Sequence, residues 1–179
     1  ANDFGNLVNR TLAMAVRYFD GERPGPRDAG SAPLAGMWEG ALARWREALN
    51  GCLLHEALAG LWDFVGAANR FVDAEQPWVL AKARSGGDGA AGERLTGSIG
   101  DLLEACRLVG LAAAPFMPET APRLAGQLGV EYPYGPDGNG GPPLDGLLAW
   151  GARGGGGSIG SPSPLFPRLE VEAAEPAGA

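Results

Sequence analysis

Two polar side chains near the start of the chain have the types and spacing to recognise a ligand. Asn6 and Arg10 are four residues apart, so they are neighbours on one face if this stretch is helical. An amide donates and accepts hydrogen bonds, and a guanidinium offers a planar fork of donors. The pair could therefore bind the edge of a flat polar ligand, or it could form an ordinary solvated face.

A second candidate follows a long apolar stretch in the middle of the chain. Pro77 lacks a backbone N–H and suits the first turn of a helix, so it predicts a break and a new short helix. Trp78 then lies in the first turn of that helix. There it could be an exposed platform on which a nucleic-acid base stacks. The alternative is a core tryptophan that staples the corner.

No set of residues predicts a catalytic or metal site. His55 is the only histidine, and with Cys52 and Cys106 it cannot supply the four ligands of a structural zinc site. Gly138–Gly141 precede two prolines and do not open a helix, so they are no dinucleotide fingerprint. No carboxylate pair or Ser–His–Asp set is indicated by spacing. We therefore predict no catalytic residue and no metal ligand.

Charge and composition restrict the possible functions further. The 179 residues carry a net charge of −7, which argues against nonspecific nucleic-acid binding but leaves room for a local basic site. Candidates for local phosphate contacts are Arg17, Lys82 and Arg84. Two cysteines, with no signal-like start, indicate a reduced, cytoplasmic compartment. No stretch has the length of a membrane span, and the start at Ala1 suggests a piece of a larger protein.

Apolar residues recur at helical spacing through most of the chain, so the predicted fold is all-α, a bundle of about five helices with an irregular C-terminal tail. The first helix spans 1–20, with Asn6, Arg10 and Arg17 opposite its apolar face. Further helices are expected at about 32–50, 53–71, from Pro77, at 93–114 and from Pro118. Gly110 lies on an apolar face, where a neighbouring helix could approach closely.

The predicted bundle covers residues 1–130, and a Gly/Pro-rich tail covers 131–179. Within the tail, residues 138–157 are expected to be an insertion or an unusually loose segment. The PLFPR segment, with its large apolar side chains, is expected to dock on another surface. The last residues, EAAEPAGA, are expected to be disordered.

Four segments together resemble one protein family: ANDFGNLVNR, ANRFVDAEQPWVLAK, LAAAPFMPETAPRLAGQLG and PLFPR. In this order and spacing they resemble the C-terminal anticodon-binding domain of methionyl-tRNA synthetase, a class I aminoacyl-tRNA synthetase. The resemblance implies a helical bundle that holds the tRNA anticodon. It places Asn6, Arg10, Pro77 and Trp78 at the anticodon. Trp78 would stack on a cytosine, and the side chains of Asn6 and Arg10 would bond to base edges or phosphate.

The same resemblance implies what this chain lacks. HIGH-like and KMSKS-like motifs and a cysteine-rich zinc knuckle are absent from the sequence, so methionine activation is expected in an upstream catalytic domain. That catalytic domain would use ATP with Mg²⁺, and whether it also holds zinc stays open. The domain described by this sequence is expected to need no cofactor. The implied partners are tRNA(Met) and the enzyme's own N-terminal catalytic domain, with no membrane. The isolated domain is expected to bind tRNA weakly.

Two alternatives stay open at this point. The chain could be the anticodon-binding domain of another class I synthetase, which a competition assay with CAU anticodons would distinguish. It could also be a helical protein-interaction module, which the acidic charge supports. A tryptophan at position 78 that is buried and far from Asn6 and Arg10 would contradict the anticodon site. A free-standing enzyme has the least support.

Overall fold

The computed structural model describes residues 2–135 and 141–166. Helices follow one another along the described chain, and their bounds are α1 (Asn2–Phe19), α2 (Pro33–Asn50), α3 (Leu54–Glu75), α4 (Pro77–Ser85), α5 (Gly89–Ala112), α6 (Thr120–Leu128) and α7 (Leu144–Leu147). Within the described residues the only β-type pairing is an isolated bridge between Glu22 and Ser158. The predicted all-α bundle is confirmed.

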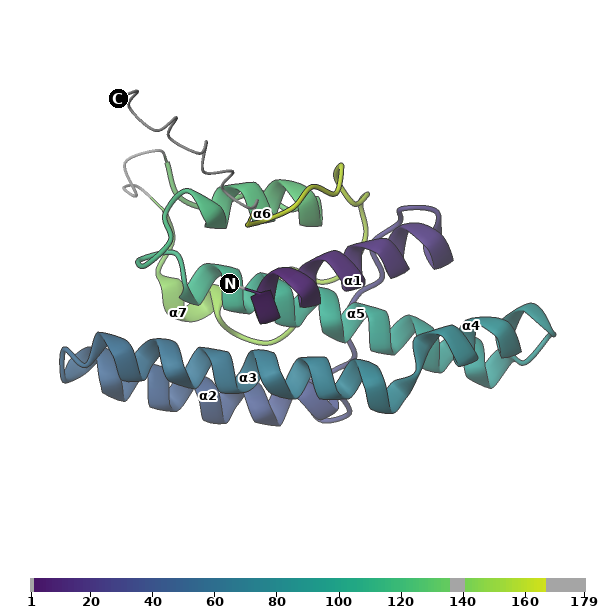
Figure 1. Ribbon diagram of the computed structural model, residues 1–179, viewed down its shortest axis with the longest axis horizontal. Coiled ribbons are helices and arrows are strands. Elements are labelled where there is room, and N and C mark those ends of the chain that lie inside the picture. Colours follow the sequence, from purple (N-terminus) through teal and green to yellow (C-terminus); the bar gives the residue numbers. More distant parts are fainter. Residues whose placement is uncertain (1, 136–140, 167–179) are drawn as a thin grey trace, which may run out of the picture.

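Helix α5 is the centre of the bundle. Figure 1 shows the antiparallel α2–α3 pair on one side of α5 and helices α1 and α6 on the other. All residues from 97 to 112 are buried, which is unusual for a helix in a domain of this size. Most of these side chains are apolar or small, and the charged ones, Asp101, Glu104 and Arg107, are all in ion pairs.

The apolar face of α1 packs as its periodicity predicts. Phe4, Leu7, Val8 and Leu12 are fully buried, and they recur at the spacing of one helical face. On α5, Gly110 allows the close approach that the sequence suggested: a Cβ atom there would meet the side chain of Leu124 on α6. Both helices therefore reach α5 through faces that the sequence specifies.

Several helix ends differ from the predicted positions. Helix α3 continues to Glu75 instead of ending near Phe71, and α6 begins at Thr120 rather than at Pro118. Helix α5 starts four residues earlier than predicted, because the Asp88 side chain accepts a hydrogen bond from the backbone N–H of Ala91 at 3.0 Å. This N-cap signal lies within a glycine-rich stretch that composition alone assigns to a loop.

Two buried charges attach the end of α7 to α5. Glu104 and Arg107 form an ion pair at 2.6 Å, and both side chains are almost wholly buried. Arg107 also donates to the carbonyl of Leu147 at 2.7 Å, and Glu104 accepts from the N–H of Gly151 at 2.8 Å. The pair is satisfied because it binds backbone groups of the tail as well as itself.

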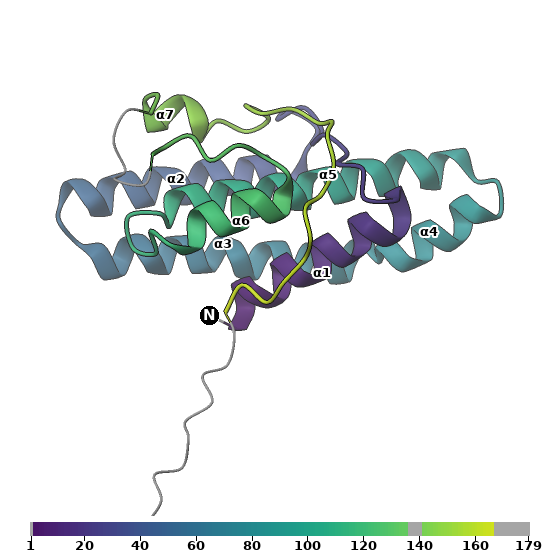
Figure 2. The ribbon, with the colours of Figure 1, turned by 90° about the horizontal axis from the view of Figure 1, so that it is seen from above.

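The glycine-rich tail makes specific backbone contacts with the bundle where it is described. We call residues 151–166 the strap; Figure 2 shows it crossing the bundle toward the start of α1. The backbones of Gly25 and Gly155 pass so close that a Cβ on Gly25 would lie 2.9 Å from the nitrogen of Gly155. The glycines therefore permit backbone-to-backbone packing rather than flexibility.

The strap ends in part of the PLFPR segment. Leu165 is buried and belongs to the core, and the docking of the whole PLFPR segment stays a prediction. Residues 136–140 and 167–179, including the rest of PLFPR and the EAAEPAGA terminus, lie outside the described part of the chain. None of the described helices is long and apolar enough to cross a membrane.

Candidate functional site

Helix α1 presents the two predicted polar side chains to solvent. Asn6 and Arg10 are both exposed, on the side opposite the buried Leu7 and Val8. Arg17 is exposed farther along the same helix. Since the apolar face is fixed by the core, the direction of these polar groups is fixed as well.

Three contacts show how α1 runs past α3 and α4. Near its start, Asn69 of α3 donates to the carbonyl of Asp3 at 3.3 Å. In the middle, Arg10 forms an ion pair with Asp73 at 2.9 Å. Near its end, Arg84 of α4 donates to the carbonyl of Tyr18 at 2.6 Å. Helix α1 therefore runs parallel to the end of α3 and to α4 (Figure 1).

The joint between α3 and α4 has a specific backbone geometry. Gln76 is both the last cap of α3 and the first cap of α4, with φ 47° and ψ 62° in the left-handed region. Its N–H donates to the carbonyl of Val72 at 3.1 Å. Pro77 follows as the first residue of α4 and is buried, as the sequence predicts. Together they set the direction in which α4 leaves the joint.

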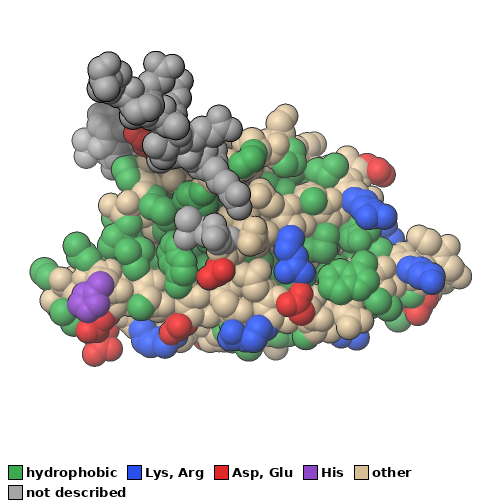
Figure 3. All heavy atoms as spheres, viewed as in Figure 1, with side chains coloured by type: hydrophobic (Ala, Val, Ile, Leu, Met, Phe, Trp, Pro, Cys, Tyr) green, Lys and Arg blue, Asp and Glu red, His purple; other side chains and the backbone are tan. Residues whose placement is uncertain are grey.

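Trp78 is exposed at the start of α4. Its exposed fraction is 46%, so the alternative of a core tryptophan is wrong. Because it lies in the chain between Asp73 and Arg84, which both contact α1, it belongs to the part of α3 and α4 that flanks α1. Figure 3 shows this face, where apolar and oppositely charged side chains lie side by side over the junction of the helices.

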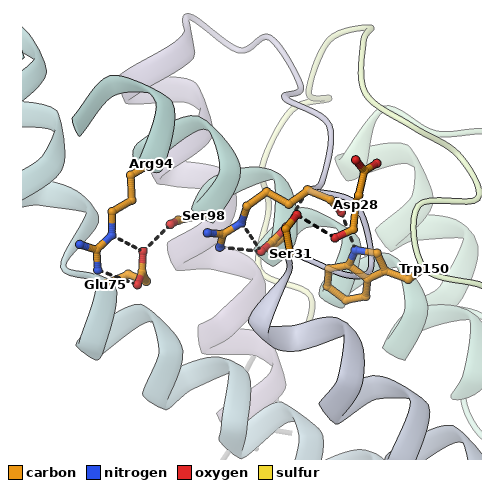
Figure 4. Close-up of polar contacts among 8 residues, drawn as sticks. Asp28, Ser31, Glu75, Arg94, Ser98 and Trp150 are labelled. Carbon is orange, nitrogen blue, oxygen red and sulfur yellow. Dashed lines mark hydrogen bonds and ion pairs between the residues drawn. The ribbon is translucent and has the colours of Figure 1, made fainter. Parts of the chain in front are cut away.

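Glu75 anchors the joint to α5, as Figure 4 shows. The Arg94 guanidinium donates to both of its carboxylate oxygens, at 3.0 and 2.9 Å, and the Ser98 hydroxyl donates at 2.7 Å. The hydrogen bond from Arg94 is the main reason why the pKa of Glu75 is lowered, although burial opposes it. This anchor lies only three residues before Trp78, so it fixes the tryptophan's helix at its root.

A second carboxylate, that of Asp101 on α5, holds the chain between α1 and α2. Asp101 is fully buried and accepts from the backbone N–H and the Nε of Arg27, both at 2.9 Å. Burial is the largest influence on its pKa, which is raised despite these bonds. Trp150 donates to the Arg27 carbonyl at 3.0 Å. This cluster supports the fold rather than an exposed site.

The three candidates for phosphate contacts differ. Arg84 is occupied, since it bonds to Tyr18 and its guanidinium lies 5.1 Å from the centre of the Phe19 ring. Arg17 and Lys82 are exposed and form no ion pair within residues 2–135 and 141–166. Of the three candidates, these two therefore remain available for a phosphate.

Sequence reasoning missed the residues that support this face. Asp73, Asn69 and Glu75 were not singled out, although all three lie in or next to the segment that carries Pro77 and Trp78. A helical projection of α3 would have put Asn69 and Asp73, four apart, on one side. Their partners lie more than sixty positions away in sequence, and no local pattern reveals such pairings.

A metal centre would be another kind of functional site. No group of three or more His, Cys, Asp and Glu side chains that could hold a metal ion is found among the described residues. His55 is exposed, with Nε2 3.8 Å from the neighbouring Glu56 carboxylate. The described residues therefore contain no candidate metal centre of this kind.

Comparison with known proteins finds relatives among methionine–tRNA ligases. Methionine–tRNA ligase of Streptococcus pyogenes serotype M1 is 34% identical over 179 residues, covering 97% of this chain and 24% of the relative. That of Clostridium acetobutylicum is 32% identical, covering 96% of this chain and 25% of the relative. Mycobacterium tuberculosis methionyl-tRNA synthetase, solved with methionyl-adenylate, is 29% identical with a TM-score of 0.76, over 94% of this chain and 31% of that one.

This chain is homologous to the C-terminal part of methionyl-tRNA synthetases. No protein-family profile matches it. The chain spans about a quarter of the length of the curated relatives it matches. The apo form of the Mycobacterium tuberculosis synthetase has the same helical arrangement, with a TM-score of 0.75 over 96% of this chain. The predicted resemblance to the synthetase family is confirmed.

Proposed function

We propose that the exposed face formed by α1 and the α3–α4 joint recognises the anticodon of tRNA(Met). The observation that carries this proposal is the joint exposure of Asn6, Arg10 and Trp78 on helices that lie alongside each other. Homology to methionine–tRNA ligases supplies the class of RNA. Neither another synthetase nor a protein-interaction module has a comparable observation in its favour.

The residues have distinct roles in this proposal. Trp78 offers a flat apolar surface on which an unstacked base can lie. The Asn6 amide donates to and accepts from a base edge. Arg10 offers its planar fork to a base or a phosphate. Pro77 holds the turn that carries the tryptophan.

Arg10 is available for this role because its present partner holds it weakly. The Arg10–Asp73 pair is exposed, with side-chain exposures of 42% and 65%. Exposed ion pairs contribute at most about 1 kcal/mol, so an RNA group can replace the carboxylate at small cost. Asp73 therefore orients the guanidinium in the free protein without blocking it.

The activity of the whole enzyme is also a proposal. The chain would act with an N-terminal catalytic domain that attaches methionine to tRNA using ATP and Mg²⁺, and no step of that reaction would use a residue of this chain. We further propose a cytoplasmic location. Support comes from the two free thiols, Cys52 and Cys106, which persist in a reducing compartment.

Binding to anticodon hairpins tests the function directly. The 179-residue chain is titrated into a labelled RNA hairpin with a CAU loop and, separately, into one with the loop bases permuted. We expect tighter binding of the CAU hairpin. Equal affinity for both would contradict anticodon recognition by this face.

Trp78→Ala should weaken CAU binding by about 1–3 kcal/mol, the usual contribution of one stacked base. Trp78→Phe should keep most of the affinity, because it keeps an aromatic face. Met37→Ala on α2 is the control, since Met37 is an equally exposed apolar side chain on another element. If Trp78→Ala bound the hairpin as tightly as wild type, the stacking role would be wrong.

Arg10→Ala should weaken binding while the thermal midpoint stays close to that of wild type, because alanine is the best helix former and the lost pair is exposed. Arg44→Ala is a matched control, since Arg44 forms an exposed pair with Asp63 between α2 and α3. A loss of stability as large as that of a core substitution would make Arg10 a structural residue instead.

A further inference from the structure

We infer that the strap, residues 151–166, is a positioning element for the anticodon face: it fixes α1 at both ends and thereby sets where Asn6 and Arg10 lie relative to Trp78. This inference rests on the proposed function. The strap itself touches none of the proposed RNA contacts, so its effect would pass through the position of α1. Three observations carry it.

The first observation is the pairing of the strap with the chain just after α1. Ile159 donates its N–H to the carbonyl of Gly21 at 2.7 Å. Arg23 donates to the carbonyl of Gly157 at 3.0 Å, and Gly156 donates back to the carbonyl of Arg23 at 2.8 Å. These backbone bonds hold the C-terminal end of α1 to the strap.

The second observation is at the other end of α1. The Phe166 ring lies against Gly5, where a Cβ atom would be 3.2 Å from ring carbon Cδ2. Gly5 is buried and directly precedes Asn6. The ring therefore covers the helix backbone next to the first proposed RNA contact, and Figure 2 shows the strap reaching this end of α1.

The third observation is that the strap is itself tied to α6. Gly160 donates to the carbonyl of Gln127 at 3.0 Å, and the Gln127 amide donates to the Ser163 hydroxyl at 3.1 Å. Arg123 donates to the carbonyl of Pro164 at 3.3 Å, and Leu165 is buried. The strap thus transmits the position of α6 to both ends of α1.

The two halves of the anticodon face therefore have separate supports. Trp78 is fixed through Glu75, which Arg94 and Ser98 hold on α5. Asn6 and Arg10 are fixed through α1 and the strap. A change in the strap should shift one half against the other, and groups that act together lose much of their effect when they are displaced.

Phe166→Ala tests the inference in the chain as it stands. We expect CAU hairpin affinity to fall about fivefold or more, as for two coupled sites, and amide hydrogen exchange at residues 7–10 to speed up. When Phe166→Ala is combined with Asn6→Ala, the fold-loss of CAU hairpin affinity should be smaller than the product of the fold-losses of the two single variants. Phe166→Leu should restore part of the affinity.

Phe116→Ala is the matched control, because Phe116 is also a half-buried phenylalanine packed on the core. It should lower the thermal midpoint without changing affinity or exchange in α1. Gly5→Ala is a second variant for the case that Phe166→Ala does not fold, since the added methyl pushes against the ring, which must give way by a few tenths of an ångström, while alanine favours the helix.

The outcomes separate the two proposals. If wild type does not prefer the CAU hairpin, the proposed function fails, and hydrogen exchange in α1 still tests the strap. If Phe166→Ala and Phe116→Ala change affinity and α1 exchange alike, or if neither Phe166→Ala nor Gly5→Ala changes them, the positioning role is overturned. Faster exchange in α1 with weaker CAU binding, specific to the strap variants, supports it.

Discussion

The two thiols lie in opposite surroundings. Cys52 is exposed in the turn between α2 and α3, with φ 56°. Cys106 is fully buried on α5, and burial raises the pKa of its thiol to about 12. Because the thiolate is the reactive form, only one of the two should be accessible to modification.

A thiol reagent at pH 8 should therefore label one cysteine per native chain and two per unfolded chain. Mass spectrometry should locate the native label on Cys52. Cys52→Ser should then leave the native chain almost unlabelled. Rapid native labelling of Cys106 would show that α5 opens far more readily than its packing indicates.

Glu75 should give the fold a measurable dependence on pH. Its folded pKa lies below the ordinary value of 4.5, chiefly because Arg94 donates to its charged form. The stabilisation is therefore fully present above pH 4.5 and is lost as the pH falls toward the folded pKa. Glu75→Gln should destabilise the chain at neutral pH by about 1 kcal/mol or more.

The same substitution should flatten the loss of stability on acidification. Urea unfolding at a series of pH values measures both effects. Glu39→Gln, an exposed change on α2, is the control and should leave the curve as it is. A wild-type dependence below pH 4.5 that Glu75→Gln fails to alter would assign the acid sensitivity to other carboxylates.

At the scale of elements, the helices were the predictable part of the fold. Their apolar faces follow the 3.6-residue period, and the buried residues of α1 are the ones that this period selects. Pro77 marked the start of α4 correctly because its missing donor acts locally. The helix ends at Asp88 and Glu75 were less predictable, since a cap and a distant ion pair extend the helices there.

The strap was the unpredictable element. Its glycine content indicates a flexible segment, yet its backbone pairs with residues 21–23 and with α6. Composition shows where side chains are absent, but it does not show which distant segment packs against the bare backbone. The same glycines that raise the entropy of the unfolded chain permit the close crossing of Gly25 and Gly155.

Glycine-to-alanine substitutions should separate the two roles of glycine. In Gly100→Ala the new methyl would collide with the backbone carbonyl of Gly25, which should cost about 1–3 kcal/mol. Gly40→Ala on α2 points into open space and should stabilise the chain by about 0.5–1 kcal/mol. Thermal unfolding of both variants measures the contrast; a stabilising Gly100→Ala would contradict the close packing.

At the scale of the whole molecule, the net charge limits how the chain can bind RNA. It is −7, and four of the eight exposed arginines on the described surface pair with a carboxylate. Of the predicted phosphate contacts, Arg17 and Lys82 are exposed and form no ion pair among the described residues. Recognition should therefore depend on bases more than on phosphates.

CAU hairpin binding should accordingly depend only weakly on salt. With about two phosphates neutralised, the slope of log affinity against log salt should be about −1.4. Lys82→Gln should reduce the slope by about 0.7 and weaken all hairpins alike. A steep slope, as for a protein with many phosphate contacts, would contradict recognition through bases.

The candidate site was predictable in its residues but not in its supports. Asn6 and Arg10 stood out because their helical spacing places them opposite the apolar face. Local sequence left Trp78 open between the core and the surface, and the family resemblance placed it at the anticodon. All three are exposed, and their contact with RNA stays a prediction. Partners such as Asp73 are joined only by tertiary packing, as are the buried pairs on α5. A single sequence does not indicate which charged residues, far apart along the chain, form ion pairs in the fold.

The contacts of the strap also bear on the order in which the chain folds. Helices α2 and α3, and likewise α4 and α5, pair with sequence neighbours, so they can close early. Arg23 and Gly154, by contrast, meet across 131 positions. During synthesis α1 emerges before the other helices described here, but the strap cannot hold it until residues 151–166 have emerged as well. The helix that begins the sequence is thus among the last to reach its final position.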